Sequence, residues 1–165
     1  MTTYREAVDD FLAQKRIAVA GVSRSGNQPA NAIFRKLRGA GYEVYAINPG
    51  ADRVEGGPSY ESLMAVPVPL DAVVAATPEA GTDDVVRQCV DLGIRRVWMH
   101  RGIGPGSVSE KAVGEAGRNG LTVLAGGCPL MFLEPDPFHR CLGWMLRVSG
   151  KLPAPDVRGR TAAGS

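Results

Sequence analysis

The sequence predicts an α/β fold built on a doubly wound, parallel sheet of five strands. Short apolar runs alternate with helical stretches along most of the chain. These runs are continuous in Val, Ile and Ala, which is typical of strands buried on both faces. Each run also ends in a small or turn-forming residue. Because the carboxyl ends of parallel strands meet at one edge of the sheet, these turns predict a ligand site there.

The strand and helix patterns follow one another in regular order. The strands are expected at residues 16–20, 43–47, 70–76, 96–99 and 121–125. Helices are expected at 30–37, 82–92 and 107–119, with at most a short helix over 60–65. Gly39 and Gly41 end the first helix, and Asn48-Pro49-Gly50 forms a turn after the second strand. Repeated strand–helix units with right-handed crossovers give a Rossmann-like fold.

Two amphipathic segments are expected to flank the sheet as terminal helices. The first, residues 2–13, carries Tyr4, Val8, Phe11 and Leu12 on one face, and the second is residues 138–148. A chain of 165 residues suggests one domain, which we place at residues 1–152. Residues 153–165 lack an apolar period and are expected to form a disordered tail.

Composition argues against several classes of function. A net charge of +2 is too small to indicate binding to nucleic acid or to a membrane surface, and no apolar window has the length of a membrane span. The three cysteines lack C-x-x-C spacing, which argues against a disulfide framework and a zinc site. We therefore expect a reduced, cytoplasmic protein with no metal site.

The turn after the first strand indicates the kind of ligand. Residues 17–26 read IAVAGVSRSG, an apolar strand followed by a tight turn and then a helix. Backbone N–H groups and the positive end of a helix dipole favour a phosphate at such a turn, which predicts a nucleotide ligand. Gly21 is expected to have little room for a Cβ, with its backbone close to that phosphate.

The pattern differs from that of dinucleotide-binding enzymes. Gly26 lies too far along to be the second glycine of G-x-G-x-x-G. Asn48 stands where such enzymes carry the acidic residue that binds a ribose hydroxyl. Both observations disfavour NAD, although an NAD(P)-dependent oxidoreductase using the same cleft stays an alternative. A strand–helix turn with no ligand is the other open interpretation.

An ordered series of segments resembles the small stand-alone CoA-binding proteins, a family similar to the N-terminal CoA-binding domain of the succinyl-CoA synthetase α subunit. The series covers about residues 10–132 and consists of residues 17–23, 41–49, 60–63, 71–74, 97–99 with Gly102, and 127–129. The resemblance implies CoA or an acyl-CoA as the ligand.

The same resemblance implies a role for particular residues. The loop that holds the CoA pyrophosphate would consist of Gly21, Val22, Ser23, Arg24 and Ser25. The residues beside the adenosine and along the rest of the cleft would be Asn48, Pro49, Ala76, Thr77, Pro78, Arg101, Gly102, Cys128 and Pro129.

Two positions depart from the family pattern. Gly50 stands where relatives often carry a lysine, which leaves Arg24 and Arg53 as candidate cations for the 3′-phosphate. His100 stands where relatives usually carry glutamine, and we expect it to contact the ligand or to be structural. For Cys128 we expect packing rather than a mixed disulfide with CoA.

The resulting expectation is a CoA-binding protein with no catalytic residues and no activity of its own. The alternative of a nucleotide-sensing regulatory module remains open beside the oxidoreductase. In that case the terminal helices would suit a homodimer.

Overall fold

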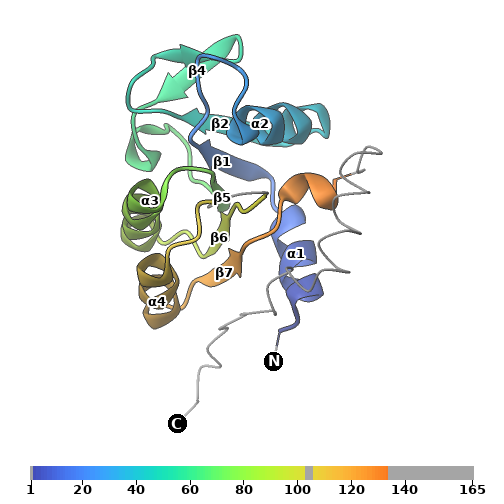
Figure 1. Ribbon diagram of the computed structural model, residues 1–165, viewed down its shortest axis with the longest axis vertical. Coiled ribbons are helices and arrows are strands. Elements are labelled where there is room, and N and C mark those ends of the chain that lie inside the picture. The colour runs from blue at the N-terminus through green and yellow to red at the C-terminus, as the bar shows by residue number, and fades with distance from the viewer. Residues whose placement is uncertain (1, 103–105, 134–165) are drawn as a thin grey trace.

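The computed structural model describes residues 2–102 and 106–133, in which helices cover both faces of one central sheet (Figure 1). The strands are β1 (Arg16–Ala20), β2 (Glu43–Ile47), β3 (Arg53–Val54), β4 (Gly57–Tyr60), β5 (Ala72–Ala75), β6 (Arg96–Met99) and β7 (Thr122–Ala125). The α-helices are α1 (Tyr4–Leu12), α2 (Pro29–Gly39), α3 (Glu79–Leu92) and α4 (Glu110–Arg118), and the 3₁₀ helices are η1 (Leu63–Ala65) and η2 (Pro129–Met131).

The sheet has the strand order β3-β4-β2-β1-β5-β6-β7. All neighbours from β4 to β7 pair in parallel, and β3 alone runs antiparallel to its neighbour. Ala18 of β1 lies between Tyr45 of β2 and Val73 of β5. The chain therefore builds the sheet outward from β1, first to one side and then to the other, which confirms the predicted Rossmann-like fold.

The sheet has seven strands where the sequence predicted five. The additional strands β3 and β4 form a hairpin whose two loop residues, Glu55 and Gly56, both have positive φ values of 50° and 76°. Glutamate is an unusual residue for such a turn, and Pro58 inside β4 is unusual for a strand, so the local sequence carries no clear hairpin signal. Tyr60, expected to begin a short helix, belongs to β4, and only Leu63–Ala65 is helical.

The predicted helices between the strands are present with shifted ends. Helix α3 begins at Glu79, three residues earlier than expected, and accommodates Gly81 in its first turn. A Cβ at Gly81 would lie 2.9 Å from Thr77 Cβ, so close packing against Thr77 favours a glycine in this first turn. Helix α4 begins after Ser109, whose hydroxyl accepts a hydrogen bond from the backbone N–H of Ala112.

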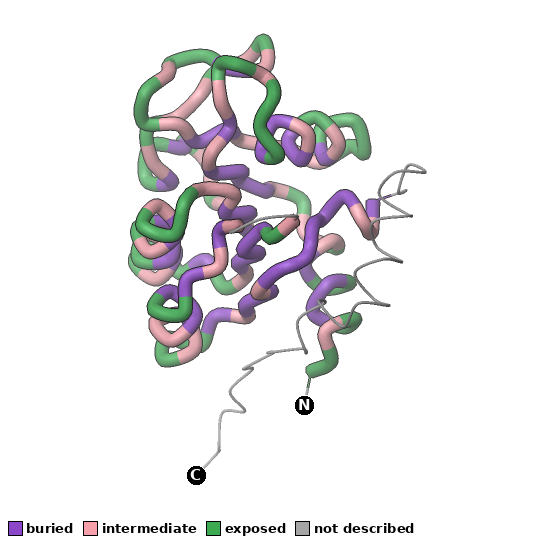
Figure 2. Tube along the Cα trace, in the orientation of Figure 1, coloured by how far each residue is buried: buried purple, intermediate pink, exposed green. Residues whose placement is uncertain are grey.

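Apolar side chains fill both layers between the sheet and the helices. Successive residues of β1 point to opposite faces, so Val19 packs toward α1 and α2 while Ala18 packs toward α3 and α4. Figure 2 shows the buried residues concentrated along the central strands. This burial on both faces explains the continuous apolar runs of the sequence.

Helix α1 confirms the amphipathic segment expected at residues 2–13. Phe11 meets the indole ring of Trp98 edge to face with 5.3 Å between ring centroids, and Asp10 accepts a 2.6 Å hydrogen bond from Arg96 Nε. The expected helix at 138–148, the tail at 153–165 and the domain end at residue 152 lie outside the described residues. No helix among residues 2–102 and 106–133 is long and apolar enough to cross a membrane.

Candidate functional site

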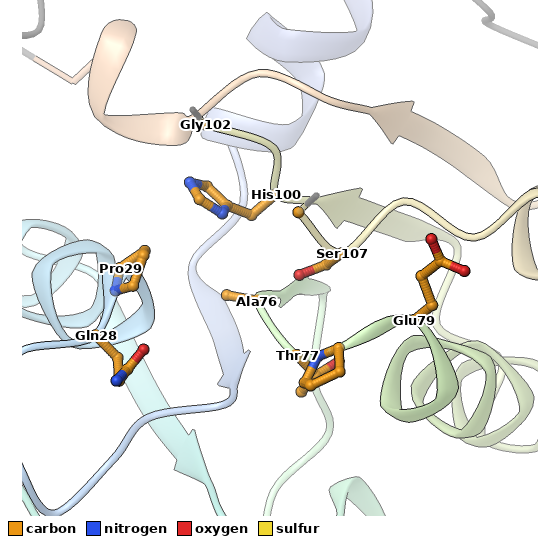
Figure 3. A pocket seen from close by; sticks show the side chains of 10 residues that line it. Gln28, Pro29, Ala76, Thr77, Glu79, His100, Gly102 and Ser107 are labelled. Atoms are coloured by element: carbon orange, nitrogen blue, oxygen red, sulfur yellow. The ribbon is translucent and has the colours of Figure 1, made fainter. Parts of the chain in front are cut away.

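A cavity of about 550 Å³ opens at the carboxyl ends of the central strands (Figure 3). It lies between the first residues of α2 and the segments that follow β5 and β6. Its walls are formed by Gln28, Pro29, Ala76, Thr77, Pro78, Glu79, His100, Gly102, Gly106 and Ser107. Four of the residues predicted from the sequence, Ala76, Thr77, Pro78 and Gly102, therefore lie together on one cavity.

Gly21 lies where β1 and β5 meet at the edge of this site. Its φ is +100°, and a Cβ built there would lie 2.4 Å from the carbonyl oxygen of Ala76. The glycine is therefore required by the approach of two segments of the protein itself. The prediction that Gly21 has little room for a Cβ is confirmed, and the contact with Ala76 accounts for it without a nearby phosphate.

The loop after Gly21 is held by hydrogen bonds from neighbouring elements. Asn31 of α2 accepts from the N–H of Ser23 at 2.9 Å and donates to the carbonyl oxygen of Ser23 at 2.7 Å. The N–H of Ser25 donates to Ser23 Oγ at 3.2 Å. Two amides that the sequence assigned to a phosphate are thus engaged within the protein, whereas the side chain of Arg24 is exposed to solvent.

Asn31 is itself held by a largely buried carboxylate on the β3–β4 hairpin. Its Nδ2 donates to Glu55 Oε1 at 2.6 Å, and Arg35 Nη1 donates to the same oxygen at 2.7 Å. The Asn31 side chain is fully buried, and that of Glu55 is only 10% exposed. Arg38 Nη1 also donates to the Glu55 carbonyl oxygen at 3.0 Å, which fixes the hairpin against α2.

Sequence reasoning missed the role of Asn31. It is a polar residue on the apolar face of a predicted helix, beside Ala30, Ile33 and Phe34. A buried amide must find hydrogen-bond partners, so this position was the available signal. Its partner Glu55 is remote in the sequence and could not be inferred.

Asn48 and Pro49 lie at the end of β2, on the opposite side of β1 from β5. The Asn48 side chain donates to the carbonyl oxygen of Val22 and accepts from the N–H of Gly50, both at 2.7 Å. Its amide therefore ties the turn after β2 to the turn after β1. Pro49 is exposed, and Arg53, a candidate cation, donates to the carbonyl oxygen of Gly56 at 3.2 Å.

His100 follows β6 and forms part of the cavity wall. The residue is 9% exposed, and burial lowers the pKa of its imidazole below the ordinary value. The ring is therefore neutral at physiological pH, when one ring nitrogen donates and the other accepts. The N–H of Ser107 donates to the carbonyl oxygen of His100 at 2.7 Å, which brings Ser107 back to the same wall.

Arg101, Cys128 and Pro129 lie beside the cavity rather than on its wall. The N–H of Arg101 donates to the carbonyl oxygen of Gly127 at 3.0 Å. Cys128 and Pro129 are buried, and Cys128 belongs to the hydrophobic cluster that also contains Trp98. Burial raises the pKa of the Cys128 thiol to about 11, so the reactive thiolate is scarce at neutral pH. These features agree with the packing role expected for Cys128.

The chain matches one known protein family over most of its length. The family described as CoA binding domain matches residues 15–134. This range contains β1 through η2 and the whole cavity wall.

Individual relatives include both short proteins and parts of much larger enzymes. An ADP-forming acetate–CoA ligase II of Archaeoglobus fulgidus is 30% identical over 88 residues, which are 52% of this chain and 13% of the ligase. The Bacillus subtilis protein YneT, which is described as uncharacterized, is 26% identical over 114 residues, 69% of this chain and 82% of YneT. This chain thus spans a small part of the ligase and most of YneT.

Solved structures show the same fold. A hypothetical protein from Pyrococcus horikoshii OT3 superposes with a TM-score of 0.72 and 25% sequence identity. The match covers 79% of this chain and 92% of the Pyrococcus protein.

The contact at Gly21 yields a first prediction. Gly21→Ala should lower the free energy of unfolding by at least about 2 kcal/mol more than Gly41→Ala, because overpacking is added to positive-φ strain. Gly41 is a matched control, since its φ is +93° but a Cβ there would meet no atom within 4 Å. Urea denaturation measures both variants. Equal losses of stability would show that the Gly21 site tolerates a side chain.

The Asn31 network yields a second prediction. Asn31→Leu should accelerate hydrogen exchange at the Ser23 amide and lower the free energy of unfolding by about 1–3 kcal/mol, because buried partners lose their hydrogen bonds. Asn27→Leu changes the same residue type at an exposed position and should do neither. Exchange is followed by NMR. An unchanged Ser23 rate in Asn31→Leu would contradict the role given to this amide.

Proposed function

This chain belongs to the family of CoA binding domains, and we propose that it is a CoA-binding protein without catalytic activity of its own. It holds the nucleotide part of CoA, or of an acyl-CoA, at the carboxyl ends of β1, β2 and β5. The observation that carries the proposal is the cavity beside the point where the strand order reverses, in a chain that belongs to this family.

The position of the cavity supports binding of a phosphorylated ligand. Ligands of doubly wound sheets bind beyond the carboxyl ends of the strands, where the strand order reverses. Here that point lies between β1 and β5, and Gln28 and Pro29 bring the N-terminus of α2 to the cavity wall. The positive end of the helix dipole favours the pyrophosphate there, with exposed Arg24 near it in the sequence as an additional cation.

The end of β2 favours CoA over NAD. An NAD site in this fold usually carries an acidic residue there, which accepts a hydrogen bond from the ribose. Asn48 occupies that position, and its side-chain amide is engaged by Val22 and Gly50.

The titratable groups near the cleft support a binding role. His100 is neutral, and no described residue forms a nucleophile–base pair with its side chain. The buried thiol of Cys128 has a pKa raised to about 11, so it is a poor nucleophile at neutral pH. The free cysteines Cys89 and Cys128 fit a reducing compartment, and we include the cytoplasm in this proposal.

Ligand binding yields a third prediction. CoA at one hundred times its Kd should raise the melting temperature by about 5–10 °C, because a ligand specific to the folded state stabilises it by about 2.7 kcal/mol. NAD and NADP at the same concentrations should have little effect. Differential scanning fluorimetry measures the shifts. A rise with NAD or NADP but none with CoA would favour the oxidoreductase instead.

The absence of catalysis yields a fourth prediction. Incubation of the protein with acetyl-CoA should release free thiol no faster than a buffer control, because no hydrogen bond pairs a nucleophile with the His100 imidazole among the described residues. A thiol-reactive dye reports hydrolysis. Turnover that is lost in His100→Gln would overturn the non-catalytic assignment and make His100 the base.

A further inference from the structure

The cavity lies on one side of the point where CoA is proposed to bind. Its wall is formed by residues after β5 and β6, whereas Asn48 lies across β1 at the end of β2. With the adenosine beside Asn48 and the pyrophosphate at the N-terminus of α2, the remaining arm of CoA extends toward β6. The cavity is therefore placed to receive the thiol end of the ligand, an inference that rests on the proposed function.

Two almost fully buried polar side chains point into this cavity. Figure 3 shows the imidazole of His100 directed between Gly102 and Pro29, and the hydroxyl of Ser107 directed toward Ala76. His100 is 9% exposed and Ser107 is 3% exposed. Neither side chain makes a hydrogen bond to another residue in the part of the chain that the structure describes. Both side chains thus present hydrogen-bonding atoms to the cavity, and a ligand inside it can bond to them.

The other walls restrict the chemistry of that partner. Pro29, Ala76, Gly102 and Gly106 are small or apolar, which suits a short aliphatic group. Among the lining residues that the structure describes there is no lysine or arginine, and Glu79 supplies a negative charge at the wall. An acyl group ending in a carboxylate would meet repulsion from Glu79 and no counter-charge.

We propose that this cavity is a subsite for the thioester end of a short, uncharged acyl-CoA, in which Ser107 and His100 donate hydrogen bonds to the thioester carbonyl oxygen. A hydroxyl and a neutral imidazole can each donate one such bond, and a carbonyl oxygen can accept two. The subsite makes the protein discriminate acyl-CoA from free CoA. His100 and Ser107 act here in recognition.

The test compares two ligands that differ only in the carbonyl. Acetyl-CoA and its thioether analogue S-ethyl-CoA are titrated into the full chain by calorimetry, with CoA titrated alongside. Acetyl-CoA should bind about tenfold more tightly than S-ethyl-CoA, since two net hydrogen bonds together amount to about one decade in Kd. Malonyl-CoA, which carries an acyl carboxylate, should bind more weakly than acetyl-CoA. Glu79→Gln should reduce the difference between these two affinities.

Variants assign the preference to the two side chains. Ser107→Ala and His100→Ala should each reduce the ratio of the two affinities to about three, and the double variant should bring it to about one. The ratio is measured within each variant, so partial unfolding affects both ligands equally. Ser59→Ala is the matched control, because its hydroxyl is buried and without a partner in the described structure but lies on β4, away from the cavity wall. This variant should keep the tenfold ratio.

The outcomes separate this inference from the function on which it rests. Binding of CoA with equal affinities for acetyl-CoA and S-ethyl-CoA would overturn the acyl subsite and leave CoA binding intact. A tenfold ratio that survives in the double variant would also overturn it. Failure of all CoA ligands to bind would refute the proposed function itself.

Discussion

The close contact between Gly21 and Ala76 is the constraint on which the site depends. The strand order reverses between β1 and β5, and the chain leaves both strands at the same edge of the sheet. The N–H of Ala76 donates to the carbonyl oxygen of Ala20 at 3.0 Å, and the N–H of Gly21 donates to that of Ile47 at 3.1 Å. These bonds hold the turns after three strands together. Only a residue without a Cβ lets the turn after β1 pass over the turn after β5, because the carbonyl oxygen of Ala76 occupies that space.

The remaining parts of the site build outward from this contact. On the β2 side, Asn48 joins the turns after β1 and β2. Asn31, which is itself bonded to Glu55, fixes the backbone of Ser23. The side chains of Asn31 and Asn48 are thus engaged by hydrogen bonds within the protein. On the β6 side, His100 and Ser107 face open space. The site therefore combines a half that is held by internal hydrogen bonds, where we propose the nucleotide, with a half whose polar side chains face the cavity, where we propose the acyl group.

The sequence predicted the features that depend on local pattern. Continuous apolar runs such as residues 72–75 identified the central strands because burial on both faces leaves no polar position. The strand ends then located Ala76, Thr77 and Gly102 at one edge, since parallel strands share their carboxyl ends. The β3–β4 hairpin escaped prediction because Glu55 takes a positive φ that tertiary contacts from Asn31 and Arg35 support. The N–H of Ser107 donates to the His100 carbonyl oxygen and holds Ser107 at the cavity, a contact that no spacing rule anticipates.

Native mass spectrometry of the purified full chain tests the central claim, binding of CoA, most directly. The account predicts a protein species heavier by the mass of one CoA or acyl-CoA, either as isolated or after addition of CoA, and released on denaturation. A spectrum that contains only the bare protein in the presence of excess CoA, or an adduct with the mass of NAD or NADP instead, would contradict it.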